Sequence, residues 1–432
     1  MRLFGMLLIA SPVLVVLSSF AQNGGSPPPT YSHDVAPILN KRCISCHSQT
    51  NIAPFSLVGY ENAKKWAPTI AVVTESKYMP PWKAKAGYGE FRDNPSLSAE
   101  EKLLLKRWAD AGAPEGDKSA VPAEPPLTTN WRMGKPDMII SPELPTKIPS
   151  EGKDFFRDYL IDPQITKPTW VKIVDYRPLN QGTVHHIIPS LMKKEEAEKC
   201  RKIKFDFDDK SWDQKSVEDI DTYSKLGFWS TGAPPFTSPD GTALLINPGD
   251  NIQLDVHYKC KGIPATEQVQ VALYFLNEPP KDQMKVRVVT TGDIYLQPGE
   301  KDRRFYCIDN KLEKETTIYA VWPHMHYDGT TFKAWVKLPS GASKPLVCID
   351  DWDPEWQLLY YLKQPMTLPV GSQIIVTGTY DNSANNPRNP HNPPRVVMGG
   401  DSSKDEMLFF ELFQVVKKDP EPEKKPDVPP KQ

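Results

Sequence analysis

Five of the eight histidines in the chain fall within three short segments. The segments are "TVHHII", "DVHYKC" and "WPHMHYDG", and their histidines are His185, His186, His257, His324 and His326. Imidazole nitrogens are common ligands of copper and zinc, so three such groups on predicted strands indicate a metal-binding protein. Packing in the core can explain one such group, but it is a poor explanation for three.

The spacing within each pair decides whether both side chains can reach one metal ion. Residues two apart in a strand point to the same face, which allows His324 and His326 to share a metal. Adjacent residues such as His185 and His186 point to opposite faces of a regular strand. If both bind one metal, we expect the strand to twist, bulge or end at that pair.

A second kind of metal chemistry is indicated by "CISCH", Cys43 to His47. This spacing is the attachment signal for haem c, in which Cys43 and Cys46 form thioethers and His47 ligates the iron. A thioredoxin-like pair needs a βαβ context and a zinc site needs a second Cys/His pair, and neither is found nearby. Met79 in "YMPPW" is the expected sixth ligand, with packing in the core as the alternative. The run 31–117 resembles the small cytochrome c domains attached to bacterial exported enzymes.

The first residues predict export. Arg2, the apolar run from Leu3 to Leu17 and the small residue Ala21 are typical of a signal peptide that spans 1–21. No later apolar run is long enough to cross a membrane, so we expect a periplasmic or secreted protein without a transmembrane segment after cleavage. The formal net charge of −2 gives no support for a nucleic-acid partner.

Length and composition predict several domains, most of them β. A chain of 432 residues exceeds one ordinary core, and 45 prolines suit β-rich domains with long loops. Helices are predicted on either side of "CISCH", at 32–42 and at 97–116, where Ser98 is the expected cap. The expected fold class is a small all-α cytochrome c domain followed by two all-β, jelly-roll-like sandwiches. The expected parts are the cytochrome c domain (31–117), a proline-rich linker (118–133), the two sandwiches (134–281 and 282–417) and a disordered tail (418–432).

From about Gly134 to Val416 the chain resembles the type II copper, ascorbate-dependent monooxygenases, which fold as two β-sandwich domains facing a cleft. The resemblance is carried by the order of a His-His pair, a distant histidine, a His-x-His pair and "GGDSSKDEM". It implies one copper ion held by His185, His186 and His257, and a second held by His324, His326 and Met407. Met398 is the nearest competitor of Met407, but it precedes the Gly-Gly turn.

The resemblance also implies an activity. The protein is expected to hydroxylate a substrate C–H bond with O2 at the site of His324, His326 and Met407, using electrons from an external donor. The expected cofactors are two copper ions and one covalently bound haem c, which we hypothesise to reduce the copper of the three histidines. An electron-transfer or copper-binding protein without oxygenase activity is the alternative. A zinc hydrolase is a more distant one, because no H-E-x-x-H segment is present.

The chain departs from the peptide-amidating members of this family. Those enzymes bind the substrate carboxylate with an arginine, an asparagine and a tyrosine, and the matching residues here are Trp322, Phe409 and Glu411. The substrate is therefore expected to be a less polar or uncharged small molecule.

Four cysteines lie outside "CISCH". An even number in an exported protein predicts two disulfides. We expect them within domains, as Cys200–Cys260 and Cys307–Cys348.

Overall fold

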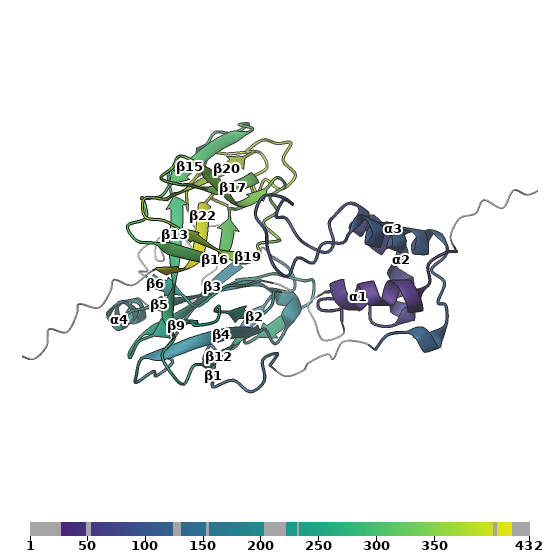
Figure 1. Ribbon diagram of the computed structural model, residues 1–432, viewed down its shortest axis with the longest axis horizontal. Coiled ribbons are helices and arrows are strands. Elements are labelled where there is room, and N and C mark those ends of the chain that lie inside the picture. Colours follow the sequence, from purple (N-terminus) through teal and green to yellow (C-terminus); the bar gives the residue numbers. More distant parts are fainter. Residues whose placement is uncertain are drawn as a thin grey trace, which may run out of the picture.

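The computed structural model describes residues 27–48, 53–123, 131–152, 155–202, 222–230, 233–400 and 404–416. Two β units lie one above the other, and a helical segment lies beside them (Figure 1). Strands make up 38% of the structure and helices 15%. The expected signal peptide, the expected tail and part of the expected linker lie outside the described residues. Among the helices described, none is long and apolar enough to span a membrane.

The first β unit is built from two sheets that enclose one apolar core. The first sheet has the order β1-β12-β4-β9, with β8 paired to β4, and the second has the order β3-β10-β5-β6, with β7 paired to β5. Helix α4 (Lys194–Lys202) packs beside them. The strands are β1 (Met138–Ile140), β3 (Phe155–Ile161), β4 (Thr169–Arg177), β5 (Val184–Met192), β6 (Thr222–Lys225), β7 (Trp229–Ser230), β8 (Phe236–Thr237), β9 (Thr242–Ile246), β10 (Asn251–Tyr258) and β12 (Gln270–Phe275), with β2 (Thr146–Ile148) and β11 (Ala265–Glu267) paired apart.

The second β unit has the sheet orders β13-β22-β16-β19 and β15-β20-β17-β18. Strands β9 and β13 pair in parallel, so the sheet β1-β12-β4-β9 of the first unit and the sheet β13-β22-β16-β19 of the second form one continuous nine-stranded sheet. The strands are β13 (Asp282–Thr291), β15 (Arg303–Ile308), β16 (Thr316–His324), β17 (Gly329–Lys337), β18 (Ser343–Ile349), β19 (Tyr360–Leu368), β20 (Gln373–Tyr380) and β22 (Leu408–Val416), with β14 (Tyr295–Leu296) and β21 (Val397–Met398) paired apart.

Strand β22 is buried on both faces. Phe410 and Leu412 belong to the core of the second unit, whereas Phe413 and Val415 belong to the core of the first. A strand covered on both sides reads as a nearly continuous apolar run, and "LFFELFQVV" has that composition. The second unit therefore packs the outer face of this sheet on the first unit.

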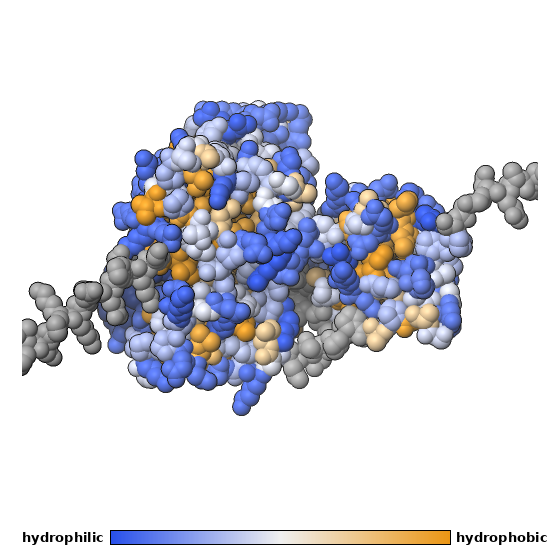
Figure 2. Space-filling model, in the orientation of Figure 1, coloured by the Kyte–Doolittle hydropathy of each residue, from blue (hydrophilic) through white to orange (hydrophobic). Residues whose placement is uncertain are grey.

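The helical segment holds three α-helices around a small core. They are α1 (Ala36–Arg42), which follows the π-helical turn η1 (Tyr31–Val35), α2 (Tyr60–Glu75) and α3 (Ala99–Asp110). Ser98 caps α3 as expected, because its hydroxyl accepts a hydrogen bond from the Glu101 N–H at 3.1 Å. Leu39, Leu105 and Trp108 are fully buried in this core. Apolar surface also gathers on the outside of this segment (Figure 2). Val72 on α2 and Leu103 on α3 are exposed apolar side chains.

The prediction of an all-α cytochrome c domain is wrong. The structure is mostly β and has no separate all-α domain. Between α2 and α3 the chain forms no helix, and Trp82, Ala84 and Phe91 from that stretch pack in the core of the second β unit. These apolar side chains find their partners outside the helical segment, so that segment is not an independent unit.

The predicted disulfides are also wrong, because none of these four cysteines, all of which the structure describes, is joined in a disulfide. Cys307 on β15 and Cys348 on β18 are separated by β20 and β17. Three strand spacings amount to about 14 Å, beyond the roughly 7 Å between Cα atoms that a disulfide allows. Cys200 packs by Met192, which pairs with the first residue of β10, whereas Cys260 follows the last residue of that strand.

We predict that unfolded, unreduced protein exposes Cys200, Cys260, Cys307 and Cys348 as reactive thiols. The geometry separates both predicted pairs, so prior reduction should not increase the count in a thiol-titration assay. Cys43 and Cys46 add to the count only in protein without attached haem. A rise in the count after reduction would show that bridges form.

Candidate metal centres

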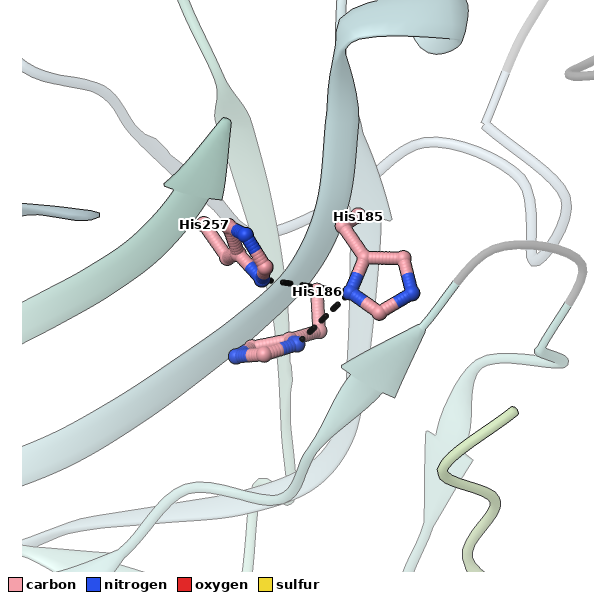
Figure 3. A group of neighbouring side chains, drawn as sticks. All are labelled: His185, His186 and His257. Atoms are coloured by element: carbon pink, nitrogen blue, oxygen red, sulfur yellow. Dashed lines mark hydrogen bonds between the residues drawn. The ribbon is translucent and has the colours of Figure 1, made fainter. Parts of the chain in front are cut away.

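His185, His186 and His257 lie together at one end of the β5–β10 pair (Figure 3). The Nδ1 atom of His185 is 3.2 Å from the Nδ1 atoms of both His186 and His257. The register explains how adjacent residues achieve this. His257 pairs with His186 and Tyr258 pairs with Val184, so His185 is the extra residue of a β-bulge. The bulge supplies the irregularity that adjacent histidines need in order to face one point.

The cluster of these three histidines, called here the first cluster, fits a metal ion. One nitrogen from each residue lies within 4.8 Å of the others, and all three side chains are buried. Burial lowers the pKa of His186 well below its usual value, and the neighbouring histidines lower it further. Neutral imidazoles with converging lone pairs are the form that binds copper or zinc.

His324 and His326, the second pair, lie at the end of β16 with their ring centroids 5.0 Å apart. The Nδ1 of His324 donates to the Gln357 Oε1 at 2.5 Å, and the Nδ1 of His326 donates to the Asp405 carbonyl at 2.9 Å. Both acceptors are oxygens, so Nδ1 carries the proton in each ring and Nε2 is left for a metal. Burial lowers the pKa of His324 to about 3, which keeps it neutral.

Met407 lies directly before β22, beside the second pair. His324 pairs with Phe409 across β16 and β22, so the same register places Met407 opposite His326. The Tyr380 hydroxyl donates to the Met407 carbonyl at 2.7 Å and fixes the backbone there. The competitor Met398 is 59% exposed on β21, where it pairs with a residue of β14. By backbone register Met407, rather than Met398, is the methionine opposite the second pair, and its role as a metal ligand stays a prediction.

Glu406 is a site residue that the sequence analysis missed. Its buried carboxylate accepts hydrogen bonds from three backbone N–H groups: His326 at 3.0 Å, Asp328 at 2.6 Å and Met407 at 3.2 Å. One side chain thus joins the two segments that carry the second pair and Met407. Burial, followed by the nearby Asp328, raises the pKa of Glu406 to about 8. Its position directly before Met407 was the available signal in the sequence.

The loop from Asp350 to Gln357 was also missed, although it contacts both histidine groups. Besides the bond from His324 to Gln357, the Trp352 indole N–H donates to the His326 carbonyl at 3.1 Å. The Nε2 of His185 donates to the Glu355 carbonyl at 2.9 Å. Because a carbonyl only accepts, Nε2 carries the proton in this tautomer and Nδ1, which faces the first cluster, is the unprotonated nitrogen.

Aromatic rings connect the two histidine groups. The Phe228 ring centroid lies 6.0 Å from that of His186 and 4.3 Å from that of Trp322. The Trp322 ring is in turn 5.1 Å from that of His324. Residues from both β units therefore meet in a water-poor junction between the two groups.

This junction also contains Trp322, Phe409 and Glu411. They are the residues that match the carboxylate-binding positions of the peptide-amidating enzymes. Trp322 and Glu411 are cross-strand partners with exposed fractions of 2% and 1%. The Trp322 Nε1 and the Glu411 Oε1 are both buried without a hydrogen-bond partner. Burial raises the pKa of Glu411 to about 7, although Lys225 acts in the opposite direction.

The residues of the predicted haem c attachment signal, Cys43, Cys46 and His47, lie on a turn after α1. The N–H groups of Cys46 and His47 donate to the Cys43 carbonyl at 3.1 and 2.8 Å, which brings both thiols and the imidazole onto one turn. The Nδ1 of His47 donates to the Phe55 carbonyl at 3.3 Å and leaves Nε2 for iron, so these residues fit haem c. Met79 is half-buried beyond α2 and is not part of the core that includes Cys43.

Comparison with known families gives one match. Residues 282–413 match the family model described as the C-terminal domain of copper type II ascorbate-dependent monooxygenase. This segment contains His324, His326 and Met407. A comparison with curated proteins finds no match.

Solved structures give only weak likenesses. The chain shares 7% identity with "Crystal Structure of the STIV MCP", at a TM-score of 0.25, over 64% of this chain and 96% of that one. It shares 9% identity with "Structure of infectious bursal disease virus Gt strain", at a TM-score of 0.17, over 66% and 81% of the two chains. Scores this low support no conclusion about fold or function.

We predict that Glu411→Gln stabilises the protein at pH 8 and has little effect near pH 4. The folded state binds the Glu411 proton with a pKa of about 7, more tightly than the unfolded chain, where glutamate titrates near about 4.3. The contribution of Glu411 to stability is therefore greatest at low pH and falls as the pH rises through this window. Melting temperatures across this range, compared with those of the exposed-site variant Glu278→Gln, measure the effect. A gap between natural protein and Glu411→Gln that does not change with pH would contradict it.

Proposed function

We propose that the protein is an exported, copper-dependent monooxygenase that hydroxylates a C–H bond of a small substrate with O2. The match of residues 282–413 to the copper monooxygenase C-terminal domain is the observation that carries this proposal. The position of His324 and His326 inside that segment, with the Nδ1 of each ring hydrogen-bonded to an oxygen, supports it. We propose that the protein acts in the periplasm or outside the cell.

The proposed ligands form two separate copper sites. His185, His186 and His257 would hold one copper ion through their three converging nitrogens. The second pair and Met407 would hold the other, and the thioether sulfur favours copper(I), the state that reacts with O2. Bound copper supplies the redox chemistry of the reaction. We also propose the division into domains at 134–281 and 282–417.

The chain itself orients the ligands and excludes water. Gln357 and the Asp405 carbonyl fix the two rings of the second pair, and Glu406 holds the backbone on both sides of the proposed site. Phe228 and Trp322 pack across the junction between the β units. Such buried, pre-ordered surroundings limit side reactions with water.

The same surroundings support the expected substrate class. Trp322 and Phe409 line the junction next to His324 with aromatic rings. No arginine stands where the peptide-amidating members bind a carboxylate. We propose a small, mostly apolar substrate that carries no carboxylate.

We further propose that haem c is attached at Cys43 and Cys46, with His47 and Met79 as iron ligands. The hydrogen bond from the His47 Nδ1 to Phe55 supports the iron-ligand role of His47. With haem and copper bound, an external donor would reduce the haem, and electrons would pass to the copper held by the first cluster and from there to the second site. An electron carrier without oxygenase activity would bind the same metals but would not consume O2 when substrate and reductant are present.

We predict two copper ions and one haem per chain in reconstituted protein. The two histidine groups are separate and each uses its own nitrogens, so neither site depends on sharing an ion. Elemental analysis at intact haem absorbance measures both numbers. Fewer than two coppers per haem would refute the two-site proposal.

We predict that Met407→Ile lowers the copper content from two to one per chain and abolishes O2-coupled hydroxylation. The variant loses a thioether ligand of the second site but leaves the first cluster and the haem untouched. Metal analysis, haem absorbance and O2 uptake check this result. Met398→Ile is the matched control, because Met398 is exposed on β21. Loss of copper in Met398→Ile with no effect of Met407→Ile would reverse the assignment.

A further inference from the structure

Residues 82–92, called here the strap, leave the helical segment and lie against the second β unit (Figure 1). The strap begins three residues after Met79, the proposed haem ligand. Two of its three aromatic side chains pack on one buried tyrosine of β19. The ring centroids of Trp82 and Phe91 are 5.0 and 5.2 Å from that of Tyr360. The connection from the proposed haem site to the β units is therefore short and anchored in a core.

Backbone hydrogen bonds also fix the strap. Strand β19 is the last in the order of the nine-stranded sheet, and the strap pairs with it. The Arg92 N–H donates to the Tyr361 carbonyl at 3.0 Å, and the Lys363 N–H donates to the Glu90 carbonyl at 2.8 Å. The strap thus holds the helical segment at a defined place, whereas a flexible linker would let it move.

Lys83 joins the strap to the Asp350–Gln357 loop. Its Nζ lies 2.9 Å from an Asp351 carboxylate oxygen and 3.4 Å from the Asp353 Oδ2. The side chains of Lys83 and Asp353 are only 14% and 15% exposed. A charge pair this far from water is weakly screened by solvent. Removal of the Lys83 charge therefore leaves the Asp353 carboxylate poorly solvated and without its cation.

A continuous line of contacts runs from Lys83 to the first cluster. The Asp353 Oδ1 accepts a hydrogen bond from the Glu355 N–H at 3.1 Å. The Glu355 carbonyl accepts from the His185 Nε2 at 2.9 Å. Lys259 of the first β unit also forms an ion pair with Glu355, which holds the loop against that unit. One carboxylate and the backbone of one residue, Glu355, therefore connect the strap to a proposed copper ligand.

We propose that electrons from the haem enter the β units at the strap. Their route to the first cluster is formed by Lys83, Asp353, Glu355 and His185. This inference rests on the proposed function and gives its relay a path. The step moves one electron: haem iron(II) is oxidised to iron(III), and copper(II) held by the three histidines is reduced to copper(I). No proton or atom is transferred, and the external donor then reduces the haem again.

Lys83 acts in this proposal as a positioning residue, because it touches neither the proposed haem ligands nor the histidines. Its charge keeps the strap and the loop in contact. A wrong position of the strap slows electron transfer without altering either metal site. The natural test is therefore the rate of electron transfer in single-electron experiments, with no substrate and no turnover.

The experiment uses the full chain with haem and copper, both oxidised, under anaerobic conditions. One electron equivalent of a fast, small reductant is mixed in, and the reduced-haem absorbance and the copper(II) EPR signal are followed. Natural protein is compared with Lys83→Met, with the conservative variant Lys83→Arg, and with Lys106→Met, which breaks an exposed ion pair on α3. Copper-free natural protein shows how long the haem stays reduced without an acceptor.

We expect reoxidation of the haem to be several-fold slower in Lys83→Met, restored in Lys83→Arg and unchanged in Lys106→Met, at equal haem potential and copper content. Equal rates in Lys83→Met and natural protein would overturn the route but leave the relay intact. If natural protein with bound copper keeps its haem reduced as long as copper-free protein does, the haem does not pass its electron to copper. That result would refute both the relay and the route. Should Lys83→Met not fold, Asp353→Asn replaces it, because asparagine keeps the acceptor for the Glu355 N–H without the charge that Lys83 binds.

Discussion

Burial of both faces of strands β16 and β22 is the constraint on which the rest of the structure depends. One face completes the core of the second β unit, and the other packs on the first unit. Water therefore has little access to the middle of these strands, and polar groups concentrate where strands end. His324 stands at the end of β16 and Met407 just before β22. The junction at Phe228 and Trp322, which joins the two histidine groups, is a consequence of the same packing.

The sequence predicted the parts of the site that depend on local geometry. His324 and His326 are two residues apart on a strand, so their common direction follows from the period of the strand. The approach of His185 and His186 does not follow from local pattern. It requires a bulge, and the bulge is defined by the register of β5 against β10, more than sixty residues further along the chain. Glu406 and the Asp350–Gln357 loop escaped notice for a similar reason, because their partners are close in space and distant in sequence.

The errors in the predicted fold have the same origin. Helices α1 and α3 were predicted from apolar spacing and from the cap at Ser98, but helix α2 and the partners of Trp82 and Phe91 were not. Those partners lie on β19, and their contacts remove the boundary that an all-α domain would need. The cysteine prediction failed because it used number and compartment alone. Sheet order separates Cys307 from Cys348, and no count of residues reveals sheet order.

The pairing of the strap with β19 has a further consequence for assembly of the chain. The last strand of a sheet exposes a row of N–H and C=O groups that another chain can pair with, and such edges promote aggregation. Here residues that precede both β units in the sequence cover that edge. The helical segment, through the strap, thus protects this edge of the sheet. A chain that lacks both exposes the edge of β19 and leaves Tyr360 uncovered. Folding of the first part of the chain and protection of this sheet edge are in this way coupled through one short stretch of backbone.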